Sequence, residues 1–282
     1  MTLRFAVLGS PIAHSRSPLL HRAAFDVLSV EAEYGRSELG EGRLATFVES
    51  LDGDWRGLSL TMPLKEDALR LADEVDEVAR LSGAANTLLL AERDGRRRVS
   101  AFNTDVYGIV EALAAAGVTR ARQVLVLGGG ATARSAAVAA AQLGAEHVDV
   151  VVRDPGRASS VVEVAHRSGL SVDVHPLATA GDDLRPDLTL STLPGGTGAE
   201  HRLAGWAAPS SGPLLDVAYD PWPSPLAALW ARAGSLAVSG LDMLMHQAVA
   251  QERIWWNGDP LTPLPREDAV IAAMREAVTA AA

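Results

Sequence analysis

Cysteine is absent from this sequence of 282 residues, which excludes disulfide frameworks and thiolate metal sites. Long apolar runs are also missing, since none approaches the roughly 20 residues that span a bilayer. The opening residues, MTLRFAVLGS, lack the apolar core and the small-residue cleavage site of a signal peptide. We therefore expect a cytoplasmic protein with no membrane partner.

Positive charge is in deficit. The chain has 25 lysines and arginines against 35 aspartates and glutamates, a net charge of −10. This balance argues against nucleic acid as a partner, whereas a small anionic ligand responds to local positive groups and is compatible with it. The length and the 48% hydrophobic content predict two domains. A monomer and a homodimer both remain open.

Apolar segments typical of strands and of helices alternate along the chain, which predicts an α/β fold. In the first part we expect strands at residues 3–8 and 58–62, a hairpin of 85–91 and 98–102 around Asp94-Gly95, and helices at 65–81 and 105–116. In the second part we expect strands at 123–127, 147–152, 171–174, 188–191, 213–217 and 236–238, and helices at 133–143, 156–168, 224–233, 242–256 and 266–281.

The stretch VLVLGGGATARSAA places glycines between an apolar strand and an alanine-rich helix. Gly128, Gly130 and Ala133 fit the pattern G-x-G-x-x-A, in which the first glycine permits a tight turn and the second a close approach of pyrophosphate. The helix N-terminus adds N–H groups and a positive dipole end. The alternative is an ordinary strand–turn–helix. The candidate cofactor loop comprises Gly128, Gly129, Gly130, Ala131, Thr132 and Ala133.

A second apolar strand ends at VVVRDPGRA, the position at which Rossmann domains select their nucleotide. Arginine suits the 2′-phosphate of NADP, whereas an acid suits the ribose hydroxyls of NAD. Arg153 comes first after the strand, so we favour NADP, while Asp154 leaves NAD open. Arg157 fits a phosphate contact and a solvated helix position equally well.

Polar residues follow several apolar segments of the first part. LSLTMPLKED puts Thr61 at a strand end and Lys65 in the first turn of a helix, where its charge opposes the helix dipole. A lysine near a cofactor can serve as general acid or base; the alternative is a solvated surface lysine. SGAANT and AFNTDVYG add Asn86, Asn103 and Asp105 where open α/β sheets carry their sites. Turn and N-cap roles are the alternatives for the last two.

The loop GSPIAHSRSP follows the first strand. Ser17 before Pro18 predicts a helix N-cap with proline at the first helical position. A helix N-terminus also accepts a carboxylate, so Ser17 has two candidate roles, whereas Ser15 has no capping role at its position. We expect His14 in a loop and His21 on a helix surface, and the scattered histidines indicate no metal site.

Seven sequence motifs occur in an order that matches one family. SPIAHSRSP is similar to its substrate-carboxylate loop, LTMPLK to its Thr-x-Pro-x-Lys strand end and LGGGATAR to its phosphate loop. SGAANT and FNTD follow at the expected places. DVAYDPWPSPL is similar to its Tyr-x-Pro-x-x-Thr-Pro-Leu segment, and SGLDMLMHQA to its Gly-Leu-x-Met-Leu-x-x-Gln-Ala helix. Over nearly the whole chain, the sequence thus resembles the shikimate dehydrogenase family.

The resemblance implies a substrate-binding domain of residues 1–104 and 241–282, a Rossmann domain of residues 105–240 inserted between them, and a site in the cleft. It implies the reversible reduction of 3-dehydroshikimate to shikimate by NADPH, on the route to chorismate and the aromatic amino acids. By position, Lys65 is the catalytic acid/base and Asp105 its partner. A cationic lysine can stabilise the negative charge that develops on the ketone oxygen and supply its proton.

The remaining site residues are implied by position as well. Substrate binding is implied for Ser15, Ser17, Thr61, Asn86, Tyr219 and Gln247. Contacts with the cofactor or the cleft are implied for Glu77, Val217 and Gly240, besides Arg153, Asp154 and the glycine loop. No metal is implied.

Three positions depart from the family's pattern. Ser59 stands where asparagine is usual, Val152-Arg153-Asp154 replaces Asn-Arg-Thr, and Ser224 replaces a threonine. The first change alters support of the site, and the last keeps a hydroxyl. The second removes an adenosine-side contact and adds an acid. The prediction of NADP as cofactor therefore has less support from the sequence than the prediction of the reaction.

Two rival functions remain. An NAD-using quinate/shikimate dehydrogenase often carries threonine at the position of Ser17, and the serine favours the biosynthetic enzyme. A non-catalytic binding or regulatory protein on the same fold need not keep Lys65 and Asp105, both of which are present.

Overall fold

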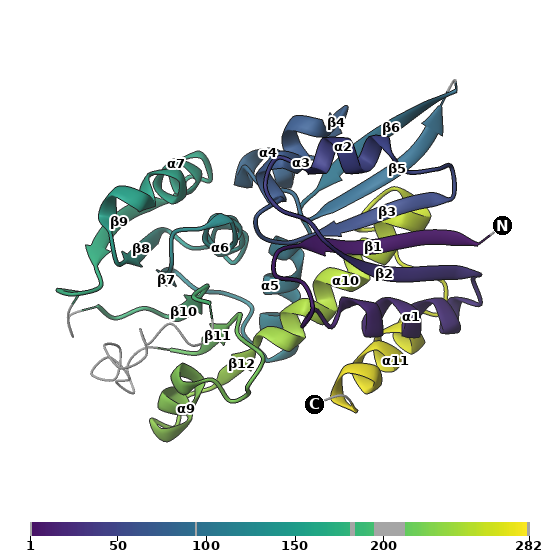
Figure 1. The fold of residues 1–282 in the computed structure, drawn as a ribbon. Coiled ribbons are helices and arrows are strands. Elements are labelled where there is room, and N and C mark those ends of the chain that lie inside the picture. The colour runs from purple at the N-terminus through teal and green to yellow at the C-terminus, as the bar shows by residue number, and fades with distance from the viewer. Residues whose placement is uncertain (1, 94, 181–183, 195–211, 281–282) are drawn as a thin grey trace. The chain divides into compact units, whose positions relative to one another are not determined.

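The computed structural model describes residues 2–93, 95–180, 184–194 and 212–280 (Figure 1). The chain divides into two compact units. The first unit comprises Met1–Thr104 and Met245–Ala282, and the second comprises Asp105–Leu244. Each unit has one six-stranded sheet with helices packed on it, which confirms the predicted α/β class.

The sheet of the first unit has the strand order β2-β1-β3-β5-β6-β4. β1, β2 and β3 are parallel, β5 is antiparallel to both β3 and β6, and β4 is parallel to β6. The carboxyl ends of β1, β3 and β6 therefore share one edge with the amino end of β5. The strands are β1 (Leu3–Gly9), β2 (Ala32–Glu38), β3 (Trp55–Leu60), β4 (Glu74–Val75), β5 (Thr87–Arg93) and β6 (Arg96–Phe102).

Helices cover both faces of this sheet, which explains why β1 is apolar and buried from Phe5 onward. Phe5 and Val7 pack with Phe25 of α1 and Trp255 of α10, while Leu8 packs on the opposite face with residues of α2 and α3. Figure 1 shows α2, α3 and α4 on one side of the sheet and α1 and α11 on the other. The helices are α1 (Ser17–Leu28), α2 (Leu44–Glu49), α3 (Lys65–Leu71), α4 (Glu77–Ser82), α10 (Gly240–Asn257) and α11 (Glu267–Thr279).

The predicted continuous helix over residues 65–81 is wrong. α3 ends at Leu71, because Ala72 adopts an extended conformation and the chain then pairs β4 with Ser100 and Ala101 of β6. Asp76 begins α4 as its N-cap and accepts hydrogen bonds from the N–H groups of Val78 and Ala79. An acceptor side chain at this position satisfies N–H groups that a helix leaves without intrahelical partners. The apolar residues of this segment still bury one face.

The sheet of the second unit is entirely parallel and has the strand order β12-β11-β10-β7-β8-β9. This order reverses between β7 and β10, the place at which open α/β sheets bind dinucleotides. The strands are β7 (Gln123–Leu127), β8 (His147–Val152), β9 (Ser171–Pro176), β10 (Leu188–Ser191), β11 (Leu214–Asp216) and β12 (Ala237–Ser239). All six predicted strands of the second part are present, with small differences at their ends.

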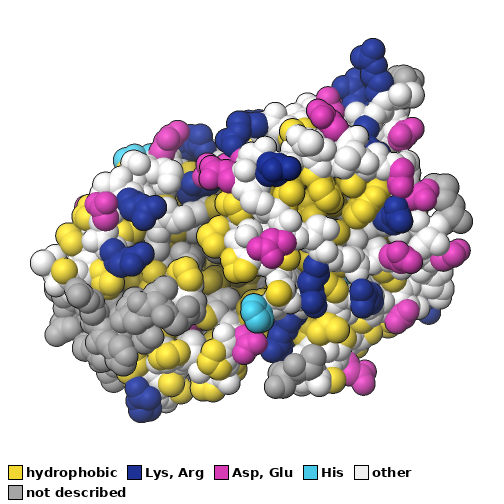
Figure 2. All heavy atoms as spheres, in the orientation of Figure 1, with side chains coloured by type: hydrophobic (Ala, Val, Ile, Leu, Met, Phe, Trp, Pro, Cys, Tyr) yellow, Lys and Arg dark blue, Asp and Glu magenta, His cyan; other side chains and the backbone are white. Residues whose placement is uncertain are grey.

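Helices of the second unit lie on its sheet at α5 (Asp105–Ala115), α6 (Ala131–Gln142), α7 (Ser159–Arg167) and α9 (Pro225–Arg232). A 3₁₀ turn, η1 (Pro155–Ala158), precedes α7, so the helix predicted at 156–168 has two parts. Leu226, Ala227 and Trp230 of α9 pack on one face of the sheet against Leu125 and Leu127. In the described ranges, no helix is both long and apolar enough to cross a membrane. On the face shown in Figure 2, basic and acidic side chains are intermixed.

Candidate active site

The carboxyl ends of β1 and β3 bring two of the sequence motifs together in the first unit. Leu8 pairs with Leu60, the N–H of Thr61 donates to the Leu8 carbonyl at 2.9 Å, and the N–H of Ser10 donates to the Met62 carbonyl at 2.9 Å. The loop GSPIAHSRSP and the segment TMPLK therefore start side by side. This fits the expectation that strand ends carry the site.

The serine loop differs in detail from its prediction as a helix start. Arg16 takes the N-cap position and Ser17 is the first residue of α1, so the N-cap prediction for Ser17 is wrong. Ser15 does have a local role, because its hydroxyl accepts the N–H of Ser17 at 3.3 Å and donates to the Ser17 hydroxyl, also at 3.3 Å. The side chain of Ser17 is buried, whereas that of Ser15 is partly exposed.

Lys65 begins α3 and is partly exposed. Its carbonyl accepts the N–H of Ala85 at 2.9 Å, which ties the start of the helix to the segment SGAANT. Glu66 and Asp67 follow in the same turn. These acids compensate the unfavourable placing of a cation at a helix N-terminus. Composition also singles out this residue, because Lys65 is the one lysine among the 25 lysines and arginines of the sequence.

Asn86 is the centre of a buried polar cluster. The backbone N–H of Thr104 donates to Asn86 Oδ1 at 2.8 Å, which fixes the orientation of the amide. Asn86 Nδ2 then donates to Thr104 Oγ1 at 2.9 Å and to Gln247 Oε1 of α10 at 3.2 Å. Asn86 and Gln247 are 2% and 7% exposed. Two of the predicted substrate residues, Asn86 and Gln247, are thus hydrogen-bonded to each other. Asn86 also bonds Thr104, a residue that the sequence did not single out.

A second row of polar residues supports this cluster, and of its members only Ser59 was singled out from the sequence. The Tyr34 hydroxyl donates to Ser59 Oγ at 2.6 Å, and Ser59 Oγ donates to Gln251 Oε1 at 2.9 Å. Gln251 Nε2 donates to Thr87 Oγ1 at 2.9 Å and to the Asn86 carbonyl at 3.2 Å. Burial raises the pKa of Tyr34 far above its usual value, so this hydroxyl stays neutral. The four-residue spacing of Gln247 and Gln251 on one helix face could have indicated this pair.

The expected surface position of His21 is wrong. His21 is fully buried. Its ring stacks on Tyr34 with centroids 4.2 Å apart, and its two nitrogens lie 2.6 Å from Glu252 Oε1 and 3.2 Å from Gln251 Oε1. His14 lies exposed in the loop, as expected. Asn103 donates to Ser82 Oγ of α4 at 2.8 Å, a tertiary contact between distant parts of the chain.

The glycine loop of the second unit has the geometry that its sequence predicts. Gly128 has a φ of +120°, and a Cβ there would overlap the side chain of Thr192 at the end of β10. Gly130 is the N-cap of α6 without a side-chain hydrogen bond, and nothing described lies within 4 Å of the place its Cβ would take. Ala133 is buried against the sheet. The loop therefore fits a pyrophosphate at the α6 N-terminus, at the switch point between β7 and β10.

The residues after β8 favour NADP by their contacts. Asp154 caps η1, since its carboxylate accepts the N–H of Gly156 at 3.0 Å. Arg153 and Arg157 are exposed, and neither guanidinium has an ion-pair or hydrogen-bond partner in the described part of the chain. The carbonyl of Arg157 lies beside Gly129. Two unengaged guanidinium groups in the segment after β8, which passes the glycine loop at Arg157, suit a phosphate.

Other predicted residues of the second unit also come together. Gly240 packs against the carbonyl of Val217 so closely that a Cβ would overlap it. Tyr219, two residues further on, is partly exposed. Ser224 keeps a hydroxyl function, donating to Asp216 at 2.5 Å and capping α9 through the N–H of Ala227 at 3.0 Å.

Two further implied residues lie at helix starts. Asp105 begins α5 and is 5% exposed. It follows Thr104 of the Asn86 cluster directly in the chain. Glu77 is exposed in the first turn of α4.

A parallel sheet with a glycine loop at its switch point, joined to a unit that gathers serine, lysine and amide side chains at one sheet edge, defines a dinucleotide-dependent oxidoreductase. Residues 7–88 match the family model of the shikimate dehydrogenase substrate binding domain. The shikimate dehydrogenase (NADP(+)) of Ignicoccus hospitalis is 34% identical over 257 residues, which cover 91% of this chain and 94% of the relative. The chain belongs to the shikimate dehydrogenase family.

Solved structures agree with this assignment. The shikimate dehydrogenase of Mycobacterium tuberculosis superposes with a TM-score of 0.84 at 38% identity, covering 97% of this chain and 99% of that one. A shikimate 5-dehydrogenase of Thermus thermophilus, described in complex with NADP(H) and shikimate, superposes with a TM-score of 0.81 at 32% identity and covers 98% of this chain and all of that one.

Proposed function

We propose that this protein catalyses the reversible reduction of 3-dehydroshikimate to shikimate with NADPH, on the route to chorismate and the aromatic amino acids. Family membership supports the proposal, as does the relative described with NADP(H) and shikimate. The observation that carries it is the gathering of the serine loop, Thr61, Lys65 and the Asn86–Gln247 cluster around one edge of a sheet. The expected compartment is the cytoplasm, and the expected assembly is a monomer or a homodimer.

The first unit binds the substrate. Ser15 and Ser17 receive its carboxylate at the amino end of α1, where the helix dipole favours a negative charge. Thr61, Asn86 and Gln247 read the ring and its hydroxyl groups. Because Asn86 and Gln247 are held by each other and by Thr104, they present fixed donors and acceptors. Fixed polar groups discriminate strongly against analogues that leave them unpaired.

The second unit binds the cofactor. The α6 N-terminus and the loop Gly128–Ala133 take the pyrophosphate, and Arg153 with Arg157 takes the 2′-phosphate. Asp154 caps η1 through one carboxylate oxygen, and the choice of NADP rests on the two arginines. Val217 and Gly240 line the cofactor on the side of β11 and β12.

A nicotinamide cofactor, when bound, would supply the hydride for reduction of the substrate ketone. Lys65 provides its ammonium group to the ketone oxygen, stabilises the negative charge that develops there and donates a proton from Nζ. In the oxidation direction the same amine accepts the hydroxyl proton. Asp105 orients the ammonium group and accepts a hydrogen bond from a substrate hydroxyl. Arginine cannot replace this lysine, because a guanidinium does not release its proton in proteins.

The lysine role is tested with Lys65→Ala and Lys65→Arg. We expect both variants to lower kcat for shikimate oxidation by about 10²–10⁴-fold with a smaller change of KM. The arginine variant separates charge from proton transfer, because it keeps the positive charge and lacks a transferable proton. Because Lys65 is the single lysine, an amine-reactive reagent should inactivate the wild type in step with modification of this residue, and shikimate should slow the loss. Near-normal turnover of either variant would remove Lys65 from the proton transfer.

A further inference from the structure

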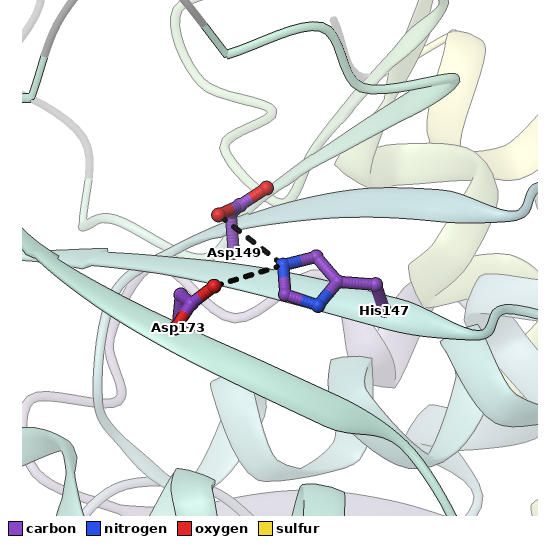
Figure 3. Close-up of side chains that lie close together, drawn as sticks. All are labelled: His147, Asp149 and Asp173. Carbon is purple, nitrogen blue, oxygen red and sulfur yellow. Dashed lines mark ion pairs between the residues drawn. The ribbon is translucent and has the colours of Figure 1, made fainter.

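Two neighbouring strands of the second unit carry a cluster of histidine and aspartate side chains that the proposed reaction does not use. His147 and Asp149 lie on β8, and Asp173 and His175 lie on β9. Asp149 pairs with Asp173 across the two strands. Because side chains alternate along a strand, residues 147, 149, 173 and 175 share one face of the sheet. Figure 3 shows the ring of His147 facing both carboxylates.

The spacing of three of these side chains suits a small divalent cation. His147 Nε2 lies 3.4 Å from Asp149 Oδ1 and 3.7 Å from Asp173 Oδ2. One ligand atom from each of the three residues lies within 4.8 Å of the others. A tetrahedral Zn²⁺ ion with nitrogen and oxygen ligands about 2.1 Å away has ligand atoms roughly 3.4 Å apart. The side chains need only small movements to reach that arrangement.

Hydrogen bonding orients the His147 ring for such a role. The Ser171 hydroxyl donates its single proton to the Glu146 carbonyl at 3.0 Å. It therefore accepts the Nδ1–H of His147 at 2.8 Å. In the neutral ring, Nε2 then turns its lone pair toward two carboxylates. Either a proton on Nε2 or a cation bound between the three side chains would satisfy these facing atoms.

A supporting residue completes the arrangement. His175 Nε2 lies 2.7 Å from Asp149 Oδ1 and can donate to that carboxylate. Metal ligands in proteins are commonly held by such outer hydrogen bonds, here Ser171 on His147 and His175 on Asp149. The side chains of His147 and Asp149 are 25% and 14% exposed, whereas Asp173 is 72% exposed and opens the cluster to solvent.

The cluster lies away from the cofactor loop. His147 pairs with Gln123, the first residue of β7, whereas the glycine loop follows the last residue of β7, Leu127. Parallel strands therefore place the cluster toward the amino edge of the sheet and the cofactor loop at its carboxyl edge. β9 is the edge strand, so a bound cation would tie this edge to its neighbour.

We propose that His147, Asp149 and Asp173 form a binding site for one divalent transition-metal ion, for which Zn²⁺ is the best fit, with water completing the coordination. Imidazole nitrogen with carboxylate oxygens is a donor set that Zn²⁺ accepts. The ion clamps β8 to the edge strand β9 and takes no part in the redox chemistry. The proposal is independent of the proposed function.

The test uses the full chain without a histidine tag, freed of metal with a chelator and titrated with Zn²⁺ by calorimetry. We expect about one ion per chain and, with Co²⁺ as probe, the visible spectrum of a tetrahedral site. His147→Ala and Asp173→Asn should weaken Zn²⁺ binding at least tenfold. His166→Ala, which removes an exposed histidine of α7, is the matched control and should bind as the wild type does.

Two further measurements accompany the titration. Zn²⁺ should raise the melting temperature of the wild type and of His166→Ala and leave that of His147→Ala unchanged. The affinity for NADP should be the same in all four proteins, which shows that the variants are folded. Equal Zn²⁺ affinity of the wild type and His147→Ala, or no binding by the wild type, would overturn the proposal. In either case His147 and the two aspartates are an ion-pair cluster only.

Discussion

Removing the Glu252 carboxylate should destabilise the first unit more than almost any other single change. Glu252 and His21 are both fully buried, with His21 Nδ1 2.6 Å from Glu252 Oε1. Gln251 turns its Nε2 toward the Asn86 carbonyl, so its Oε1 accepts the Nε2–H of His21. A second hydrogen must then lie between His21 Nδ1 and Glu252. The other oxygen of Glu252 accepts the indole N–H of Trp256 at 2.7 Å.

Two variants separate lost hydrogen bonds from lost charge. Glu252→Ala leaves the buried His21 and Trp256 donors without acceptors, and we expect a loss of about 3–5 kcal/mol of unfolding free energy. For a unit of this size, that corresponds to a fall in melting temperature on the order of 10 °C. Glu252→Gln keeps the shape, because its amide can donate to a neutral His21 and its carbonyl can accept from Trp256. We expect this variant to cost only about 1 kcal/mol.

The assay is thermal and urea unfolding of the three proteins side by side. Since a chain with two units need not unfold in one step, amide hydrogen exchange in α1 and α10 identifies the transition that belongs to the first unit. A loss in Glu252→Ala that is no larger than the loss in Glu252→Gln would refute this account of the buried pair.

Three further outcomes follow from the structure. Ser15→Ala should raise the KM for shikimate about tenfold with little change in stability; an unchanged KM would return the loop to a purely structural role. Arg153→Ala and Arg157→Ala should each raise the KM for NADP by roughly tenfold and spare activity with NAD, whereas equal losses would contradict a phosphate contact. Arg253 bonds Glu267 at 2.7 and 2.6 Å and lowers the pKa of its carboxyl below the usual 4.5. Glu267→Gln should therefore lower the unfolding free energy by about 1 kcal/mol near neutral pH. This difference from the wild type should vanish as the pH falls through the lowered pKa. Urea titrations over a pH series that show a constant difference would contradict the ion pair.

Much of the second unit could be predicted from local sequence. The strands Gln123–Leu127 and His147–Val152 have the predicted bounds, because residues 124–127 and 150–152 are continuous buried apolar runs and turn residues flank both strands. The glycine loop was predictable for the same local reason. Its positive φ and its close approach to Thr192 admit no side chain.

The errors in the predicted secondary structure occur where contacts between distant residues determine it. β2 was missed because, as an edge strand, it buries only Tyr34 and shows little alternation. Its absence from the prediction hid the Tyr34–Ser59 hydrogen bond and the stacking partner of His21. Likewise, β4 interrupts residues 65–81 only because β6 is there to pair with it.

The candidate site was predictable as a set of motifs but not as a set of contacts. The motifs that follow β1, β3 and β6 do meet at one edge of the sheet, because these three strands run in the same direction. The contacts of Asn86 and Thr87 depend on α10, which is distant in the chain. This helix packs its polar face, with Gln247 and Gln251, against the two residues. The four-residue spacing of Gln247 and Gln251 indicates a shared helix face, but no local pattern says what that face packs against.

A steady-state kinetic comparison shows whether this protein is an NADP-dependent enzyme for shikimate. The purified wild type is assayed with NADP and with NAD, each with shikimate and with quinate, by following the reduced nicotinamide. We expect kcat/KM to be highest for shikimate with NADP. A higher kcat/KM for quinate with NAD would contradict it.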